Sequence, residues 1–188
     1  MMGGNFPRVL AFLVLSLLIP FPASSRMVNY SFDGVVTEVM DGDTFLLETI
    51  RPYTPAKFWV RLYGVFAPVL AHNGKPGQPY AVKAKAALEE QLNGQKVRVE
   101  VREVDPNERQ VGLVYLRSRN INEDMLREGW GWYWRTPEYR FIQFDDDDRL
   151  YRAEEEARDN RRGLWRETNP QPPWEFRNPQ NERAIHGR

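Results

Sequence analysis

The sequence of 188 residues contains no cysteine and only two histidines. The lack of cysteine excludes disulfide bonds, thiolate nucleophiles and cysteine-ligated metal sites. The formal net charge is zero, because 26 Lys and Arg residues balance 26 Asp and Glu residues. Strong sequence-independent binding to nucleic acid rests on neutralising many phosphates, and this chain has no excess of cations for that task. Any site for an anion must therefore be local.

A long apolar run is missing as well. The run "VLAFLVLSLLI" covers residues 9–19, whereas a membrane-spanning helix needs about 20 apolar residues. Arg8 precedes this run, "PFPASS" follows it, and the small residues Ala23 and Ser25 stand at −3 and −1 of a cut before Arg26. This order predicts a signal peptide over residues 1–25 and a secreted or periplasmic protein of net charge −1. The alternative is an uncleaved membrane anchor; cleavage would leave no stable association with the membrane.

The remaining chain has the length of one domain and predicts an α+β fold that is mainly β. Alternating or continuous apolar patterns indicate five short strands, at residues 34–40, 44–49, 57–64, 96–103 and 111–116. Three helices are expected, at residues 78–94 with Pro79 near the start and Asn93-Gly94 as the stop, at 122–128 with Asn122 as N-cap, and at 145–163. This order favours a five-stranded OB-fold barrel with three packed helices over residues 26–168. Residues 169–188 form a proline-rich tail that we expect to be extended.

Three features could carry chemistry. Asp41-Gly42-Asp43 is typical of a hairpin turn, in which Gly supplies a positive φ, but its carboxylates could also hold a cation. Arg61 shares a strand face with two aromatic residues and could present its guanidinium to a phosphate. The tryptophans of "GWGWYW" (129–134) could stack on bases or pack in the core, and the sequence leaves both interpretations open.

Several blocks, taken in order, resemble the staphylococcal-nuclease (thermonuclease-like) family. They cover roughly residues 34–165 and are "VTEVMDGDTFLL", "VRLYGVFAP", "GQPYAVKAKAAL", "ERQVGLVYL", "NEDMLREGWGWY" and "YRAEEEARDNRRGLW". The resemblance implies a five-stranded OB barrel with three helices, which agrees with the pattern of the residues themselves. It also implies Ca²⁺ as cofactor, DNA and RNA as substrates, and cleavage of phosphodiesters in active members.

The resemblance assigns roles residue by residue. Asp43 matches a calcium-binding carboxylate of the family's DGDT motif, and Asp41 lies beside it. Arg61 and Arg109 match the two arginines that contact the phosphate and stabilise charge in the transition state. The Tyr and Gly that precede the second arginine in the family are Asn107 and Glu108 here.

The acidic half of the family's site is replaced. Phe66 stands at the second calcium carboxylate, and Val69 stands at the glutamate that activates or orients the attacking water. Loss of a general base alone typically forfeits a factor of about 10²–10⁴ in rate. His72, three positions after Val69, could act as a replacement base, but a loop histidine facing water is the preferred interpretation.

Three functional hypotheses follow. The first is an exported, monomeric domain that binds nucleic acid, a nucleotide or another phosphate ligand with weak or absent hydrolysis, and with doubtful Ca²⁺ binding. The second is an active metal-dependent endonuclease with an altered site. The third is an envelope protein-interaction module in which the cleft has no role. Phe66 and Val69 beside the retained arginines favour the first.

Overall fold

The computed structural model describes residues 25–50, 55–134 and 146–177. The predicted signal peptide, apart from Ser25, and the last part of the predicted tail lie outside the described residues. The strands are β1 (Arg26–Val39), β2 (Thr44–Thr49), β3 (Lys57–Leu62), β4 (Val65–Phe66), β5 (Lys96–Val104), β6 (Gln110–Leu116), β7 (Arg119–Asn120) and β8 (Trp132–Tyr133). The helices are α1 (Ala81–Leu92), α2 (Ile121–Arg127), α3 (Asp147–Asp159), the 3-10 turn η2 (Gly163–Arg166) and α4 (Pro173–Phe176).

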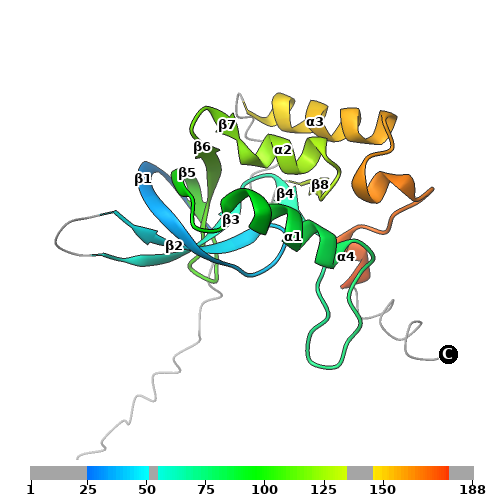
Figure 1. The fold of residues 1–188 in the computed structure, drawn as a ribbon, viewed down its shortest axis with the longest axis horizontal. Helices are drawn as coiled ribbons and strands as arrows, with labels where there is room; N and C mark the ends of the chain where they lie inside the picture. Colours follow the sequence, from blue (N-terminus) through cyan, green and yellow to red (C-terminus); the bar gives the residue numbers. More distant parts are fainter. Residues whose placement is uncertain (1–24, 51–54, 135–145, 178–188) are drawn as a thin grey trace, which may run out of the picture.

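The main sheet has six strands in the order β3-β2-β1-β5-β6-β7 (Figure 1). β3 also pairs with β6 in parallel, so the pairings of β1, β2, β3, β6 and β5 form a closed circuit. β4 and β8 form a separate two-stranded sheet. The expectation of a mainly β fold with packed helices is confirmed, and the closed circuit is consistent with an OB-type fold.

Two strand boundaries differ from the prediction by more than one residue. The first strand begins at Arg26 rather than at residue 34, because residues 26–35 pair along β5 from Val104 to Lys96. The third strand ends at Leu62 rather than at residue 64. Gly64 has a φ of 71°, in the left-handed region that favours glycine, and turns the chain into β4.

The helices agree with the prediction in place but not in every detail. α1 ends at Asn93-Gly94 as expected, with Gly94 at a φ of 71°. The predicted N-cap of α2 at Asn122 is wrong, since the Asn120 side chain accepts hydrogen bonds from the N–H groups of Asn122 and Glu123. Asn122 is fully buried, where its side chain accepts from Val114 N and donates to the carbonyls of Tyr63 and Gly112.

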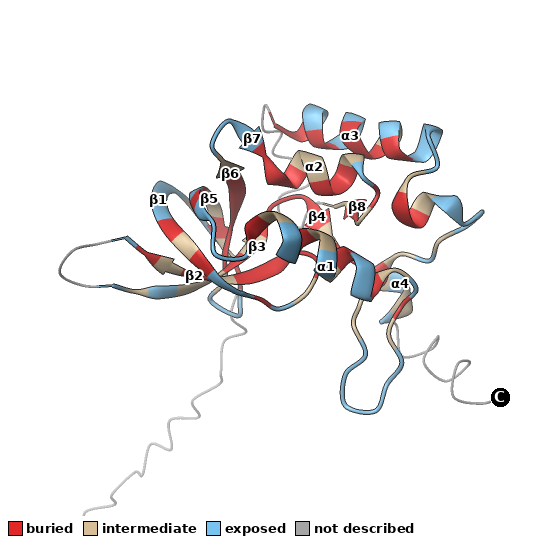
Figure 2. Cartoon of the chain, in the orientation of Figure 1, coloured by how far each residue is buried: buried red, intermediate tan, exposed pale blue. Residues whose placement is uncertain are grey.

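The predicted extended tail is wrong for Pro173–Phe176, which form the helical turn α4. Proline at the first helical position needs no N–H partner, so "PPWEF" can begin a helix. Figure 2 shows buried residues concentrated where the sheet meets α1 and α2. Within the described part of the chain, no helix combines the length and the apolar character needed to cross a membrane.

Candidate functional site

Strand β3, which belongs to the closed strand circuit, positions Arg61. On β3 it stands opposite Thr44 of β2 and beside Val111 of β6. Its Nε lies 3.6 Å from Asp43 Oδ1, and its Cζ lies 4.3 Å from the centre of the Phe66 ring. The Arg61 side chain is only 17% exposed, so the ion pair and the cation–π contact hold the guanidinium in a partly desolvated position.

Asp43 has both carboxylate oxygens in internal hydrogen bonds. Oδ2 accepts from Ala67 N at 2.9 Å, and Oδ1 accepts from Thr44 Oγ1 at 2.8 Å. Asp43 is buried, and its bond from Ala67 N joins the turn after β1 to the segment that follows β4. The oxygens therefore act as structural acceptors in this arrangement.

Asp41 forms the turn with Asp43. Its Oδ1 accepts from Asp43 N at 2.9 Å, a local hydrogen bond typical of aspartate in a turn. Burial, followed by the negative charge of Asp43, raises the pKa of Asp41 to about 6, although the Asp43 N–H and Arg61 act in the opposite direction. Asp41 is therefore partly protonated close to neutral pH.

The predicted positive φ of Gly42 is wrong. Glycine is required at this position because the neighbouring residues leave no room for a side chain. A Cβ at this position would lie 2.7 Å from Ala67 Cβ and 2.8 Å from Ala84 Cβ, and no left-handed φ is recorded for Gly42. The turn therefore packs directly against the segment after β4 and against α1.

Arg109 is oriented by an acidic residue of its own loop. Its Nε lies 2.6 Å from Asp105 Oδ2, while Asp105 Oδ1 accepts from the N–H groups of Asn107 and Arg109. Glu108 has a φ of 60°, a conformation for which glycine is the usual choice. The loop thus keeps a left-handed turn without glycine and fixes the direction of Arg109.

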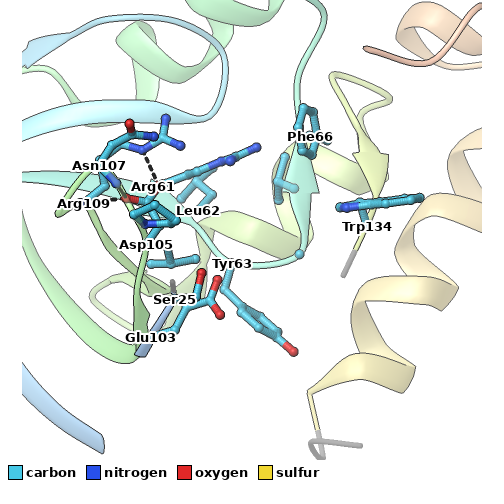
Figure 3. Close-up of a pocket in the computed structure, with 14 residues that line it drawn as sticks. Ser25, Arg61, Leu62, Tyr63, Phe66, Glu103, Asp105, Asn107, Arg109 and Trp134 are labelled. Atoms are coloured by element: carbon cyan, nitrogen blue, oxygen red, sulfur yellow. Dashed lines mark hydrogen bonds and ion pairs between the residues drawn. The ribbon is translucent and has the colours of Figure 1, made fainter. Parts of the chain in front are cut away.

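The two arginines line a common pocket of ≈ 220 Å³ (Figure 3). In Figure 3 the Arg61 side chain extends toward Phe66, with Trp134 beyond it. The pocket wall also contains carboxylates and further aromatic side chains: Tyr63, Glu103, Asp105 and Trp134. Arg61, Arg109 and Phe66 therefore line one pocket, and their roles in it stay a prediction.

Val69 and His72 are not among the residues that line this pocket. Val69 N donates to the Gln78 side chain at 2.8 Å, and Val69 O accepts from Gln78 N at 2.8 Å, so the segment from 69 to 78 closes into a loop. His72 is exposed and pairs with Lys75 through backbone atoms. The geometry therefore gives no support to His72 as a replacement base.

The donor set does not fit a calcium ion. Ca²⁺ requires roughly six to eight oxygen ligands. The turn supplies only two carboxylates, Asp41 and Asp43. Asp43 accepts internal hydrogen bonds at both oxygens and Asp41 accepts one at Oδ1, while Phe66 brings an aromatic ring. Among the residues that the structure describes, no cluster of three or more His, Asp or Glu side chains could hold a metal.

Sequence reasoning missed two parts of the site. The spacing of Asp105 and Arg109 at i and i+4 offered a signal for the first, although the pair lies in a loop and not on a helix. The second is Trp174, which stacks on Trp134 with ring centres 4.2 Å apart. No pattern in the tail places a tryptophan next to a residue 40 positions earlier.

The closed strand circuit is consistent with a staphylococcal-nuclease-like domain, and the comparison with protein families agrees. The family described as "Staphylococcal nuclease homologue" matches residues 59–167, so the chain belongs to this family. A "Micrococcal nuclease" of Shigella flexneri is 33% identical over 159 residues, which cover 78% of this chain and 80% of that protein.

Longer relatives match over only part of their length. The "Probable staphylococcal-like nuclease CAN2" of Oryza sativa subsp. japonica is 33% identical over 66% of this chain, which spans 30% of that protein. The "Probable endonuclease lcl3" of Talaromyces marneffei is 32% identical over 77% of this chain and 51% of its own length. Membership points to a nuclease or nucleic-acid-related function, and the family is known to use Ca²⁺.

Proposed function

We propose that this chain is an exported, monomeric member of the family that binds nucleic acid through Arg61 and Arg109 and hydrolyses it weakly or not at all. One observation carries the proposal: the Arg61 guanidinium lies 4.3 Å from the Phe66 ring, at the position of a calcium carboxylate in the family. Arg61 rests on this aromatic face and keeps its ion pair with Asp43. With Phe66 in place of a carboxylate, the arginines can still bind a phosphate, whereas the site lacks the oxygen ligands that a hard cation needs.

The two arginines suit a phosphate because a carboxylate holds each of them at Nε, the side of the guanidinium nearest the backbone. Asp43 contacts Arg61 through Nε, and Asp105 contacts Arg109 through Nε. A phosphate would accept from the Nη groups at the outer end of each planar fork. Aromatic side chains also line this pocket, and nucleic-acid bases stack on such rings.

The affinity should be moderate and sensitive to salt. Glu103 and Asp105 also line the pocket, and the chain as a whole carries no excess of positive charge. Two phosphate contacts on a single strand correspond to a slope of about −1.4 in log K against log salt concentration. A strong basic nucleic-acid binder would show a much steeper slope.

Binding of a labelled single-stranded oligonucleotide, followed by fluorescence anisotropy at several salt concentrations, tests the proposal. Arg61→Ala should weaken binding about tenfold or more, since a charge-assisted hydrogen bond contributes about 1.5–3 kcal/mol. Arg98→Ala is the matched control, because Arg98 lies on β5 with its side chain 56% exposed and outside the pocket. Equal losses in both variants would contradict a specific role of the pocket.

Cleavage assays decide between this proposal and an active endonuclease. Plasmid and single-stranded substrates are incubated with Ca²⁺, Mg²⁺ or Mn²⁺, using the parent and Arg61→Ala. We expect little or no metal-dependent cleavage by the parent. Robust cleavage that disappears in Arg61→Ala would instead support the active enzyme. Absence of oligonucleotide binding in every variant would favour the protein-interaction module.

Export is part of the proposal and rests on the residues before Arg26. The expected cut leaves a chain whose first residue opens β1, where Arg26 pairs with Val104. Intact mass measurement of the protein collected outside the cytoplasm should show a chain that starts at Arg26. A protein that keeps residues 1–25 and stays with the membrane fraction would support the anchor instead.

A further inference from the structure

The C-terminal segment, residues 169–177, returns to the pocket after α3 and η2. Its backbone is fixed beside the loop after β4, because Gln78 Nε2 donates to Gln171 O at 2.8 Å. Pro173 at the start of α4 is buried. The segment is therefore docked on the domain rather than projecting into solvent.

Trp174 is the centre of this docking. Its ring stacks on Trp134 with centres 4.2 Å apart and planes inclined by 28°. It meets Phe66 at 6.0 Å and Trp132 at 6.5 Å, in both cases close to edge-on. These distances and angles are the preferred geometries of aromatic pairs. We call Phe66, Trp132 and Trp134 the aromatic seat of the segment.

The aromatic seat is shared with the pocket of the two arginines. Phe66 and Trp134 line that pocket and also contact Trp174. Phe66 additionally receives Arg177, whose Cζ lies 5.7 Å from the ring centre. The residue that replaces the family's acid is thus also a contact surface for the C-terminal segment.

We propose that Trp174 is an intramolecular competitor for the pocket: it covers the Trp134 ring on which a planar ring of the ligand would otherwise stack. The inference rests on the proposed function, because the competing ligand is a nucleic acid held by Arg61. A covalently attached competitor acts at a high effective concentration, commonly in the millimolar range for short flexible linkers, so a single stacked ring can compete measurably. Removing Trp174 leaves Arg61, Arg109 and Trp134 in place and opens the stacking surface.

Trp174→Ala in the full chain tests the competition. Binding of a 5′-labelled single-stranded oligonucleotide should become about three- to tenfold tighter, in line with the strength of one aromatic pair. The near-ultraviolet circular dichroism of the stacked Trp134–Trp174 pair should disappear in the same variant. Trp174→Phe should retain most of the inhibition, because a smaller ring can still stack. Phe176→Ala, which removes another ring from α4, is the matched control and should change neither quantity.

The outcomes separate this inference from the proposed function. Loss of the dichroism signal with unchanged, Arg61-dependent binding would refute the competitor and leave the proposed function intact. Weaker binding by Trp174→Ala would also refute it, because Trp174 would then belong to the binding surface. Binding that appears only in Trp174→Ala would support it most directly. Failure of every variant to bind would refute both proposals, provided that the thermal unfolding of each variant remains cooperative.

Discussion

Replacing Asp41 by asparagine should stabilise the protein at neutral pH and leave it nearly unchanged at acidic pH. Asparagine keeps the Oδ1 acceptor for the Asp43 N–H, which Asp41 uses at 2.9 Å. It removes a charge whose presence is unfavourable, since burial and the neighbouring Asp43 charge raise the pKa of Asp41 to about 6. The substitution therefore isolates the free-energy cost of ionising Asp41.

The sign follows from proton binding. Between the ordinary pKa of 3.8 and about 6, the folded protein holds a proton on Asp41 that the unfolded chain has already released. The free energy of unfolding must therefore fall as pH rises through this window. A shift of this size corresponds to about 2–3 kcal/mol, because one pKa unit is about 1.36 kcal/mol. Asp41→Asn should match the parent at about pH 4 and exceed it by that amount at about pH 8.

Urea unfolding in the presence of a chelator, followed by tryptophan fluorescence at five pH values, measures this difference. Glu90→Gln, on the exposed face of α1, is the solvent-exposed control. A stability difference between Asp41→Asn and the parent that stays constant or shrinks as pH rises would refute the reasoning. The result also bears on the site, since a carboxyl that stays partly protonated near pH 6 is a poor ligand for a hard cation.

Three further predictions concern the cleft and the core. Phe66→Asp with Val69→Glu should gain Ca²⁺-dependent cleavage of about 10²-fold in a plasmid assay if a glutamate side chain at 69, outside the pocket lining, reaches the attacking water. No gain in a well-folded variant would mean that position 69 lies too far from the pocket to supply a base. Gly42→Val should lower stability by about 1–3 kcal/mol in urea unfolding through overpacking, and adding Ala84→Gly should restore part of the loss, because the two Cβ atoms would otherwise lie 2.8 Å apart. Asn122→Ala should lower the free energy of unfolding by about 3–4 kcal/mol, since three buried backbone groups lose their partner. Calorimetry should show a thermal midpoint lowered by about 10 °C, and a drop of only about 1–2 °C would contradict that role.

Local patterns in the sequence were sufficient for most elements. The alternation Val97, Val99, Val101 predicts a half-buried strand, and all three residues are buried on β5. Asn93-Gly94 predicts the end of α1 at the observed place. These predictions succeed because side-chain periodicity and turn chemistry act within a few residues of chain.

Contacts between distant segments were beyond such reasoning. The residues near position 26 show no burial pattern that would predict a strand, because the first part of β1 is largely exposed. This part is a strand because it pairs with β5. The cap of α2 was misplaced by two residues because both asparagines suit a cap, and only the packed fold makes Asn122 a buried bridge.

The same distinction, between local sequence patterns and contacts of distant segments, applies to the candidate site. The sequence alone determined which chemical groups exist: two arginines, one acidic turn, and the apolar residues Phe66 and Val69. Only the tertiary structure decided how they are arranged, with Arg61 over the Phe66 ring, Val69 outside the pocket and Trp174 against Trp134. The physical reason is that residue identity fixes charge and shape, whereas the contacts of the site join distant residues and depend on the packing of the whole fold. Phe66 and Trp174, for example, are 108 positions apart.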